Sequence, residues 1–118
     1  MSLINLASGS SIRKLLGLAS QSVPVVTSEG KNGGAATLTN GVYKYKNNRI
    51  IVVRISTVLN KEVPATKGKA YVNNTGTNIS VFLKPVKKGL PEKPFTLPAN
   101  SLLFVDSVKY KTVCFLPV

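Results

Sequence analysis

The sequence contains no histidine, a single cysteine and only four acidic residues. Without histidine, the chain lacks the commonest general base, zinc ligand and pH-sensitive side chain of proteins. The lone thiol of Cys114 can neither close an intrachain disulfide nor build a thiolate metal site. The four acids are spread along the chain beside expected loops, so their spacing does not indicate paired-carboxylate or two-metal chemistry: Glu29, Glu62, Glu92 and Asp106. We therefore expect a protein that is not an enzyme and that takes no metal, cofactor or small-molecule substrate.

Long apolar runs and nucleotide-binding motifs are also missing. No stretch reaches the 18 or so apolar residues of a membrane span, and the N-terminus lacks the basic start of a signal peptide. The glycines of segment 29–34 are not followed by the Gly-Lys-Ser or Gly-Lys-Thr of a phosphate-binding loop. The sequence thus predicts no membrane partner and assigns the glycine-rich segment to a linker.

Positive charge is the feature that the chain has in excess. Sixteen Lys and Arg face four acids, which leaves a net charge of +12. Such a balance favours polyanionic partners: nucleic acid, an acidic protein face or an anionic membrane surface. The membrane surface has little support, because the N-terminal segment is too short and too weakly basic for a membrane-binding helix. Only three of the basic residues are arginine, the side chain whose forked donors read base edges, so any nucleic-acid contact is expected with the phosphate backbone. Lysines that keep strand edges from pairing are the alternative explanation.

The first 34 residues differ from the rest of the chain. Four apolar residues have the spacing of one helical face, and this predicts a short amphipathic helix: Ile12, Leu15, Leu16 and Ala19. A helix of this length is unstable alone, so it would pack on its own sheet or on a neighbouring subunit. We assign residues 1–34 to an N-terminal arm with this helix and the glycine-rich linker, and residues 35–118 to a β-domain.

From residue 35 onward, short apolar segments alternate with turn signals. Asn40-Gly41 predicts a tight hairpin turn. The segment 49–55 is β-branched almost throughout, which predicts a central strand buried on both faces. Further strands are expected at 69–72, 79–84, 102–106 and 110–116, with a loop rich in proline and lysine at 85–98. The pattern indicates a mainly β fold, a small antiparallel β-sandwich or barrel that follows the N-terminal helix or arm.

Tyrosine and lysine alternate at 43–46 and again at 109–111. On a strand, the rings and the ammonium groups would then lie on opposite faces. A single-strand binder places both on one surface, so rings packed inward with lysines in solvent are favoured over base stacking. The candidate polyanion-contact residues are Lys44, Lys46, Arg49, Lys84, Lys87, Lys88, Lys109 and Lys111.

Residues 71–83 and 95–106 resemble small β-sandwich accessory proteins of bacteriophage particles. The shared pattern is a strand, a turn of the Asn-Gly kind and an alternating strand, followed by a Leu-Pro-Ala-Asn-Ser corner at 97–101 and another strand. The resemblance implies a capsid accessory, decoration or minor structural protein that works in a symmetric assembly, as a homo-oligomer located in the virion.

Two functions remain open at this point. The first is a non-enzymatic virion structural or assembly protein that binds neighbouring protein subunits through Ile12, Leu15, Leu16 and Ala19. The second is a basic nucleic-acid-binding β-barrel module that makes non-specific backbone contacts, and for this module a cytoplasmic location is the alternative to the virion.

The first hypothesis predicts the effect of deleting residues 1–20. The truncated chain should retain its β circular dichroism spectrum but lose assembly, because the apolar docking face is removed while the β-domain is left intact. Light scattering measures the assembly state of both chains. A truncated protein that still assembles like the full chain would contradict the docking role of the arm.

Overall fold

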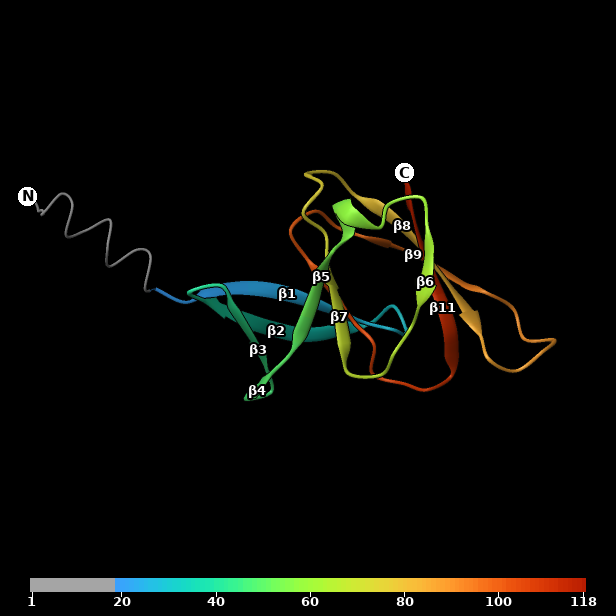
Figure 1. Cartoon of the computed structure of the whole chain (residues 1–118), viewed down its shortest axis with the longest axis horizontal. Helices are drawn as coiled ribbons and strands as arrows, with labels where there is room; N and C mark the ends of the chain where they lie inside the picture. Colours follow the sequence, from blue (N-terminus) through green and yellow to red (C-terminus); the bar gives the residue numbers. More distant parts are fainter. Residues whose placement is uncertain (1–18) are drawn as a thin grey trace, which may run out of the picture.

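The computed structural model describes residues 19–118 and shows a mainly β protein with two sheets (Figure 1). The larger sheet, called the barrel sheet here, contains in spatial order β4 (Asn48–Arg49), β3 (Val42–Tyr45), β2 (Asn32–Thr39), β1 (Gln21–Thr27), β10 (Leu102–Phe104), β7 (Lys69–Val72) and β5 (Ile51–Arg54). The second sheet contains β6 (Glu62–Pro64), β11 (Tyr110–Pro117), β8 (Ile79–Pro85) and β9 (Lys93–Leu97). The expected mainly β fold is confirmed.

One continuous segment supplies both ends of the strand order in the barrel sheet. Its first part, β4, pairs antiparallel with β3, and its second part, β5, pairs parallel with β7. A hydrogen bond of 3.1 Å from the Ile50 N–H to the Tyr43 carbonyl is the last link to β3 before the segment turns away. The sheet therefore curls into a nearly closed barrel.

Most strand pairs are antiparallel, but β1–β10 and β5–β7 are parallel. A parallel pair needs a long crossover because the chain must return to the starting end of the sheet. Residues 55–68 make the crossover from β5 to β7, through the short 3-10 helix η2 (Ile55–Thr57) and through β6 of the second sheet. The two sheets are thus joined by the chain as well as by packing.

Alternation along the strands divides the core into two groups. On β10, Leu102 packs inside the barrel, whereas Leu103 points to the second sheet. On β7, Ala70 and Tyr71 divide in the same way. The same alternation gives β8 one buried face, because three of its residues are fully buried between the sheets: Ile79, Val81 and Leu83.

The β-domain begins earlier than the sequence indicated. Residues 21–27 form β1, which pairs with both β2 and β10, and the expected boundary between residues 34 and 35 falls inside β2. Gly33 is a strand residue that Tyr45 approaches closely, with the Tyr45 hydroxyl donating to the Gly33 carbonyl at 2.6 Å. A Cβ at Gly33 would lie 3.0 Å from that hydroxyl oxygen. Assigning this glycine to a linker is therefore wrong, because its small size serves close packing.

The expected N-terminal helix lies almost wholly outside the described residues, as do Ile12, Leu15 and Leu16. Of the four predicted docking residues, Ala19 alone is described, and it is exposed in a bend just before β1.

The expectation of a central strand at 49–55 is wrong. Residues 48–54 are divided into β4 and β5, and within the described part of the chain β5 has a ladder partner on one side only. Ile51 is 73% exposed, and Arg54 also lies at the surface. The β-branched run reflects a strand that must bend across the barrel, and it does not reflect burial on both faces.

A buried amide holds together the two segments that carry the phage-protein resemblance. The Asn73 side-chain amide donates to the carbonyls of Thr77, Leu97 and Pro98 at 2.8, 3.0 and 3.1 Å. Its side-chain oxygen accepts from the N–H and hydroxyl of Thr75. Asn73 thereby ties the turn after β7 to the corner at 97–101, and it is fully buried.

Replacing Asn73 by alanine should lower the free energy of unfolding by about 3 kcal/mol, because the buried Leu97 carbonyl and several part-buried groups lose their partners. Asn74→Ala is the matched control, since among residues 19–118 that exposed amide bonds only with Ser56, and it should change stability by less than about 1 kcal/mol. Urea unfolding measures both variants, and equal losses would contradict a special role for Asn73.

Candidate polyanion-binding face and strand groove

Glu29 is the centre of a small charged cluster between the barrel sheet and the second sheet. Its carboxylate oxygens lie 3.2 Å from Lys109 Nζ and 3.9 Å from Lys93 Nζ. The Tyr110 hydroxyl donates to the same carboxylate at 3.3 Å. Burial raises the pKa of Tyr110, and the neighbouring Glu29 charge raises it further. The cluster joins the β1–β2 turn to β9 and to the start of β11, so its role is structural.

The other acids near the second sheet are also in structural contacts, except for the exposed Glu92. Glu62 accepts from the Thr112 hydroxyl at 2.6 Å and lies 3.3 Å from Lys84 Nζ. These hydrogen bonds, the Thr112 bond first, hold the pKa of Glu62 below its ordinary value. Asp106 accepts a hydrogen bond from the buried Ser28 hydroxyl. Within residues 19–118, no three acidic or cysteine side chains group as metal ligands would.

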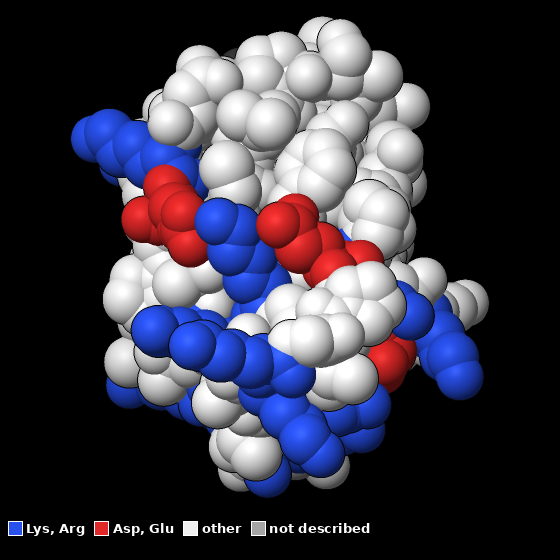
Figure 2. Space-filling view, turned by 90° about the vertical axis from the view of Figure 1, so that its right-hand side faces the viewer, with Lys and Arg blue, Asp and Glu red and all other residues white. Residues whose placement is uncertain are grey.

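The acids therefore lie at one side of the molecule. Figure 2 looks onto the end where β8, β9 and β11 lie, and it shows acidic side chains set among lysines. Between Glu29 and Glu62 the chain carries no acid, and this stretch, called the acid-free region here, forms β2 to β5. Its basic residues are Lys31, Lys44, Lys46, Arg49, Arg54 and Lys61.

The outer face of β2, β3 and β4 places two positive charges directly opposite each other. Arg49 is the cross-strand partner of Lys44, and Lys44 is in turn the partner of Thr37. The three side chains share one face, and both cations are exposed. Like charges in directly opposed positions destabilise a strand pair. Among the described residues, no acid lies in an ion pair with either cation, so an external anion would relieve this repulsion.

Hydroxyl and amide groups surround the Lys44–Arg49 pair. The Ser20 and Thr39 side-chain oxygens are hydrogen-bonded at 2.7 Å. The shallow hollow at this face, called the basic face here, is lined by Ser20, Thr37, Thr39, Asn40, Val42, Lys44 and Arg49. Hydroxyl and amide donors beside two cations are the groups that contact phosphate oxygens.

The structure separates the eight predicted polyanion-contact residues. Lys84 and Lys109 are in ion pairs with Glu62 and Glu29. Lys46 lies over the Tyr45 ring, 5.4 Å from its centroid, in the turn between β3 and β4. The remaining five are exposed, and only the first two of them are cross-strand partners: Lys44, Arg49, Lys87, Lys88 and Lys111.

The tyrosine rings of segments 43–46 and 109–111 pack inward, as the alternation with lysine favours. Tyr45 is buried in the barrel against Phe104, Tyr43 is half-buried, and Tyr110 is buried beside Glu29. Their rings do not share the basic face with the lysines, so that face offers no aromatic platform for stacking bases.

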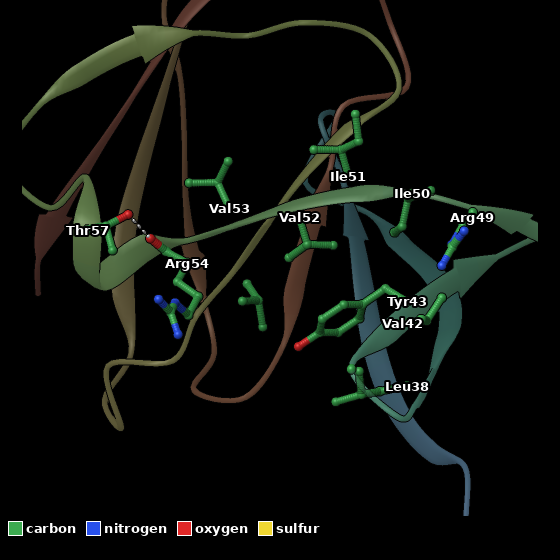
Figure 3. A pocket seen from close by; sticks show the side chains of 12 residues that line it. Leu38, Val42, Tyr43, Arg49, Ile50, Ile51, Val52, Val53, Arg54 and Thr57 are labelled. Atoms are coloured by element: carbon green, nitrogen blue, oxygen red, sulfur yellow. Dashed lines mark hydrogen bonds between the residues drawn. The ribbon is translucent and has the colours of Figure 1, made fainter. Parts of the chain in front are cut away.

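A second surface, which the sequence did not indicate, is a groove beside β5 (Figure 3). It opens where the segment 48–54 turns away from β3. Its floor is apolar and is formed by the buried Val72 and by four half-buried side chains: Leu38, Tyr43, Ile50 and Val52. Arg54 lies at one end and Arg49 at the other. The β-branched, proline-free composition of segment 49–55 predicts a strand, but no local pattern in the sequence predicts that one edge of this strand is open.

Comparison with models of known protein families, with curated proteins and with solved structures finds no match. The similarity to phage accessory proteins thus remains a resemblance of sequence pattern. Among residues 19–118, no helix has the length and apolar character needed to cross a membrane.

Titration of Tyr110 tests the charged cluster. Because its pKa in the folded protein lies above the ordinary value of about 10, the neutral phenol is favoured, and its contribution to stability is lost as the pH rises through the folded pKa. The tyrosinate absorbance difference between the wild type and Tyr110→Phe should therefore titrate above pH 10. When the same comparison is made in the Glu29→Gln background, the titration midpoint of Tyr110 should fall. It should stay above the ordinary value, since the phenol remains buried. An unchanged midpoint in Glu29→Gln would contradict the assigned cause.

Proposed function

We propose that this chain is a non-enzymatic structural protein of a larger assembly, which works by binding neighbouring macromolecules. The observation that carries the proposal is the separation of charge. Ion pairs and hydrogen bonds engage three of the four acids near the second sheet, whereas the acid-free region presents only positive charge. A surface of one sign attracts a partner of the other sign and repels copies of itself. The proposed partner is therefore polyanionic.

A virus particle is the assembly that we propose, and the phage-protein resemblance of residues 71–83 and 95–106 supports it. In such a particle, packaged nucleic acid or an acidic shell protein would supply the negative charge. The buried Asn73 contacts maintain the shape of the resembling segments, so these segments serve as scaffold. Contact with the polyanion is assigned to Lys44 and Arg49 on the basic face, which is one part of the acid-free region.

Nucleic-acid binding is the second candidate, and the directly opposed Lys44 and Arg49 favour it. Because the neighbouring tyrosine rings are packed in the core or half-buried, contact would be with phosphates and would not depend on base sequence. If each of these two side chains binds one phosphate of a single strand, the pair should contribute about −1.4 to the slope of the log binding constant against the log salt concentration.

Removing the opposed pair tests this assignment. The double variant K44Q/R49Q should bind a thymidine oligonucleotide more weakly, and its salt slope should be shallower by about 1.4. The control K61Q/K67Q removes the same charge from exposed positions away from the basic face, and its slope should stay near that of the wild type. Fluorescence anisotropy over a salt series gives both values.

Equal slopes in the two double variants would show that bulk charge, not the basic face, binds the oligonucleotide. Absence of binding at low salt would remove nucleic acid as the partner and leave an acidic protein face as the polyanion.

A further inference from the structure

The groove beside β5 is separate from the proposed polyanion contact in its chemistry, because its floor is apolar. We propose that this groove is an acceptor site for an extended segment of a partner protein. The segment would carry alternating apolar and acidic side chains and would add as a strand along the open edge of β5. This inference goes beyond the proposed function and does not depend on nucleic-acid binding.

The first argument is the open edge. β5 pairs with β7 on one side, and within residues 19–118 no strand pairs with its other side. In a strand paired on one side, alternate N–H and C=O groups project from the open edge and can pair with another chain. Charges, prolines and bulges commonly protect such edges, yet the sequence of β5 is Ile-Val-Val-Arg, with a charge only at its last position.

The second argument is the floor of the groove. Leu38 and Tyr43 from the β2–β3 hairpin face Val52 of β5 across the opening, and all three are half-buried (Figure 3). An added strand would direct every second side chain toward this floor. Apolar side chains at those positions would complete the burial that the barrel itself leaves unfinished.

The third argument is the charge at the groove. Arg54 is exposed, and no carboxylate among the described residues is in an ion pair with it. Figure 3 shows the Tyr43 ring directed across the opening, with its hydroxyl pointing toward the side on which Arg54 lies. A guanidinium and a hydroxyl at an apolar groove are donors suited to a carboxylate.

Charge also distinguishes among the candidate occupants. Residues 1–18 contain no acid and bring Arg13 and Lys14, so the arm of this chain would add repulsion at Arg54. A second copy has a net charge of +12 and meets the same repulsion. Nucleic acid would satisfy the arginine but would place phosphates over an apolar floor. An acidic and apolar segment of a partner protein satisfies both features.

The experiment uses the full chain, isotopically labelled, and a fluorescent peptide of alternating valine and glutamate as the probe. Amide resonances of β5 and of the β2–β3 hairpin should shift on titration, and Arg54→Glu should weaken peptide binding by about tenfold or more. Lys67→Glu is the matched control, because it makes the same charge change at an exposed position outside the groove, and its effect should stay within about twofold.

A second variant tests the groove without changing charge. Tyr43→Phe keeps the ring and removes the hydroxyl, and it should weaken peptide binding by roughly three- to tenfold. Arg49 is left unchanged in every variant because it lines both the groove and the basic face. Circular dichroism confirms that each variant retains the fold.

Two altered peptides test the mode of binding. Replacing every glutamate by lysine should abolish binding, since the charge complementarity at Arg54 is reversed. Replacing alternate residues by proline should also abolish it, since strand addition requires the peptide N–H groups.

Several results would overturn the proposal. If Arg54→Glu and Lys67→Glu weaken peptide binding equally, the effect is one of net charge and not of the groove. Full binding by the proline peptide would exclude strand addition. Groove resonances that move when residues 1–18 are deleted would make the arm the occupant. Self-association lost in Arg54→Glu would make a second copy the occupant. Displacement of the peptide from the groove by an oligonucleotide would assign the groove to nucleic acid.

Discussion

The pairing of one segment, residues 48–54, with two different strands is the constraint on which the rest of the structure depends. β4 continues the antiparallel ladder of β3, and β5 joins β7 in parallel, so the sheet must curl until its two ends meet. This closure buries Tyr45 inside the barrel. A strand that leaves one neighbour to reach another cannot keep its hydrogen bonds to the first, and the groove beside β5 is the consequence.

Electrostatic contacts divide the molecule in a second way. Glu29 and Glu62 bind lysines that lie far away in the sequence. The Glu62 ion pair joins β6 to β8 within the second sheet, and the Glu29 ion pairs join the β1–β2 turn to β9 and to the residue before β11. Of the two acids, Glu29 thus holds the second sheet against the barrel. What remains on β2 to β4 is positive charge without an ion pair among residues 19–118, together with the hydroxyl groups of the basic face. The charges that form ion pairs and the cations that lack them thus lie in different parts of the fold.

Local patterns were sufficient for much of the fold. The strands at 69–72 and 110–116 follow from β-branched and aromatic runs, and Asn40-Gly41 forms its turn with positive φ at both residues. The buried face of 79–84 follows from strict alternation. Gly33 was misassigned because its need for space comes from Tyr45, twelve residues along the chain. Arg54 was missed as a site residue because the exposure of β5 depends on which strands surround it.

The sequence by itself determined the β class, the lack of histidine and thiolate chemistry, and a net charge of +12. These properties belong to composition and to short-range periodicity, which survive in any arrangement of the strands. Only the tertiary structure decided which lysines are paired, where two cations oppose each other and which strand edge is left open. Those features arise from contacts between residues far apart in the chain, such as Tyr110 with Glu29, and local propensity carries no information about such contacts.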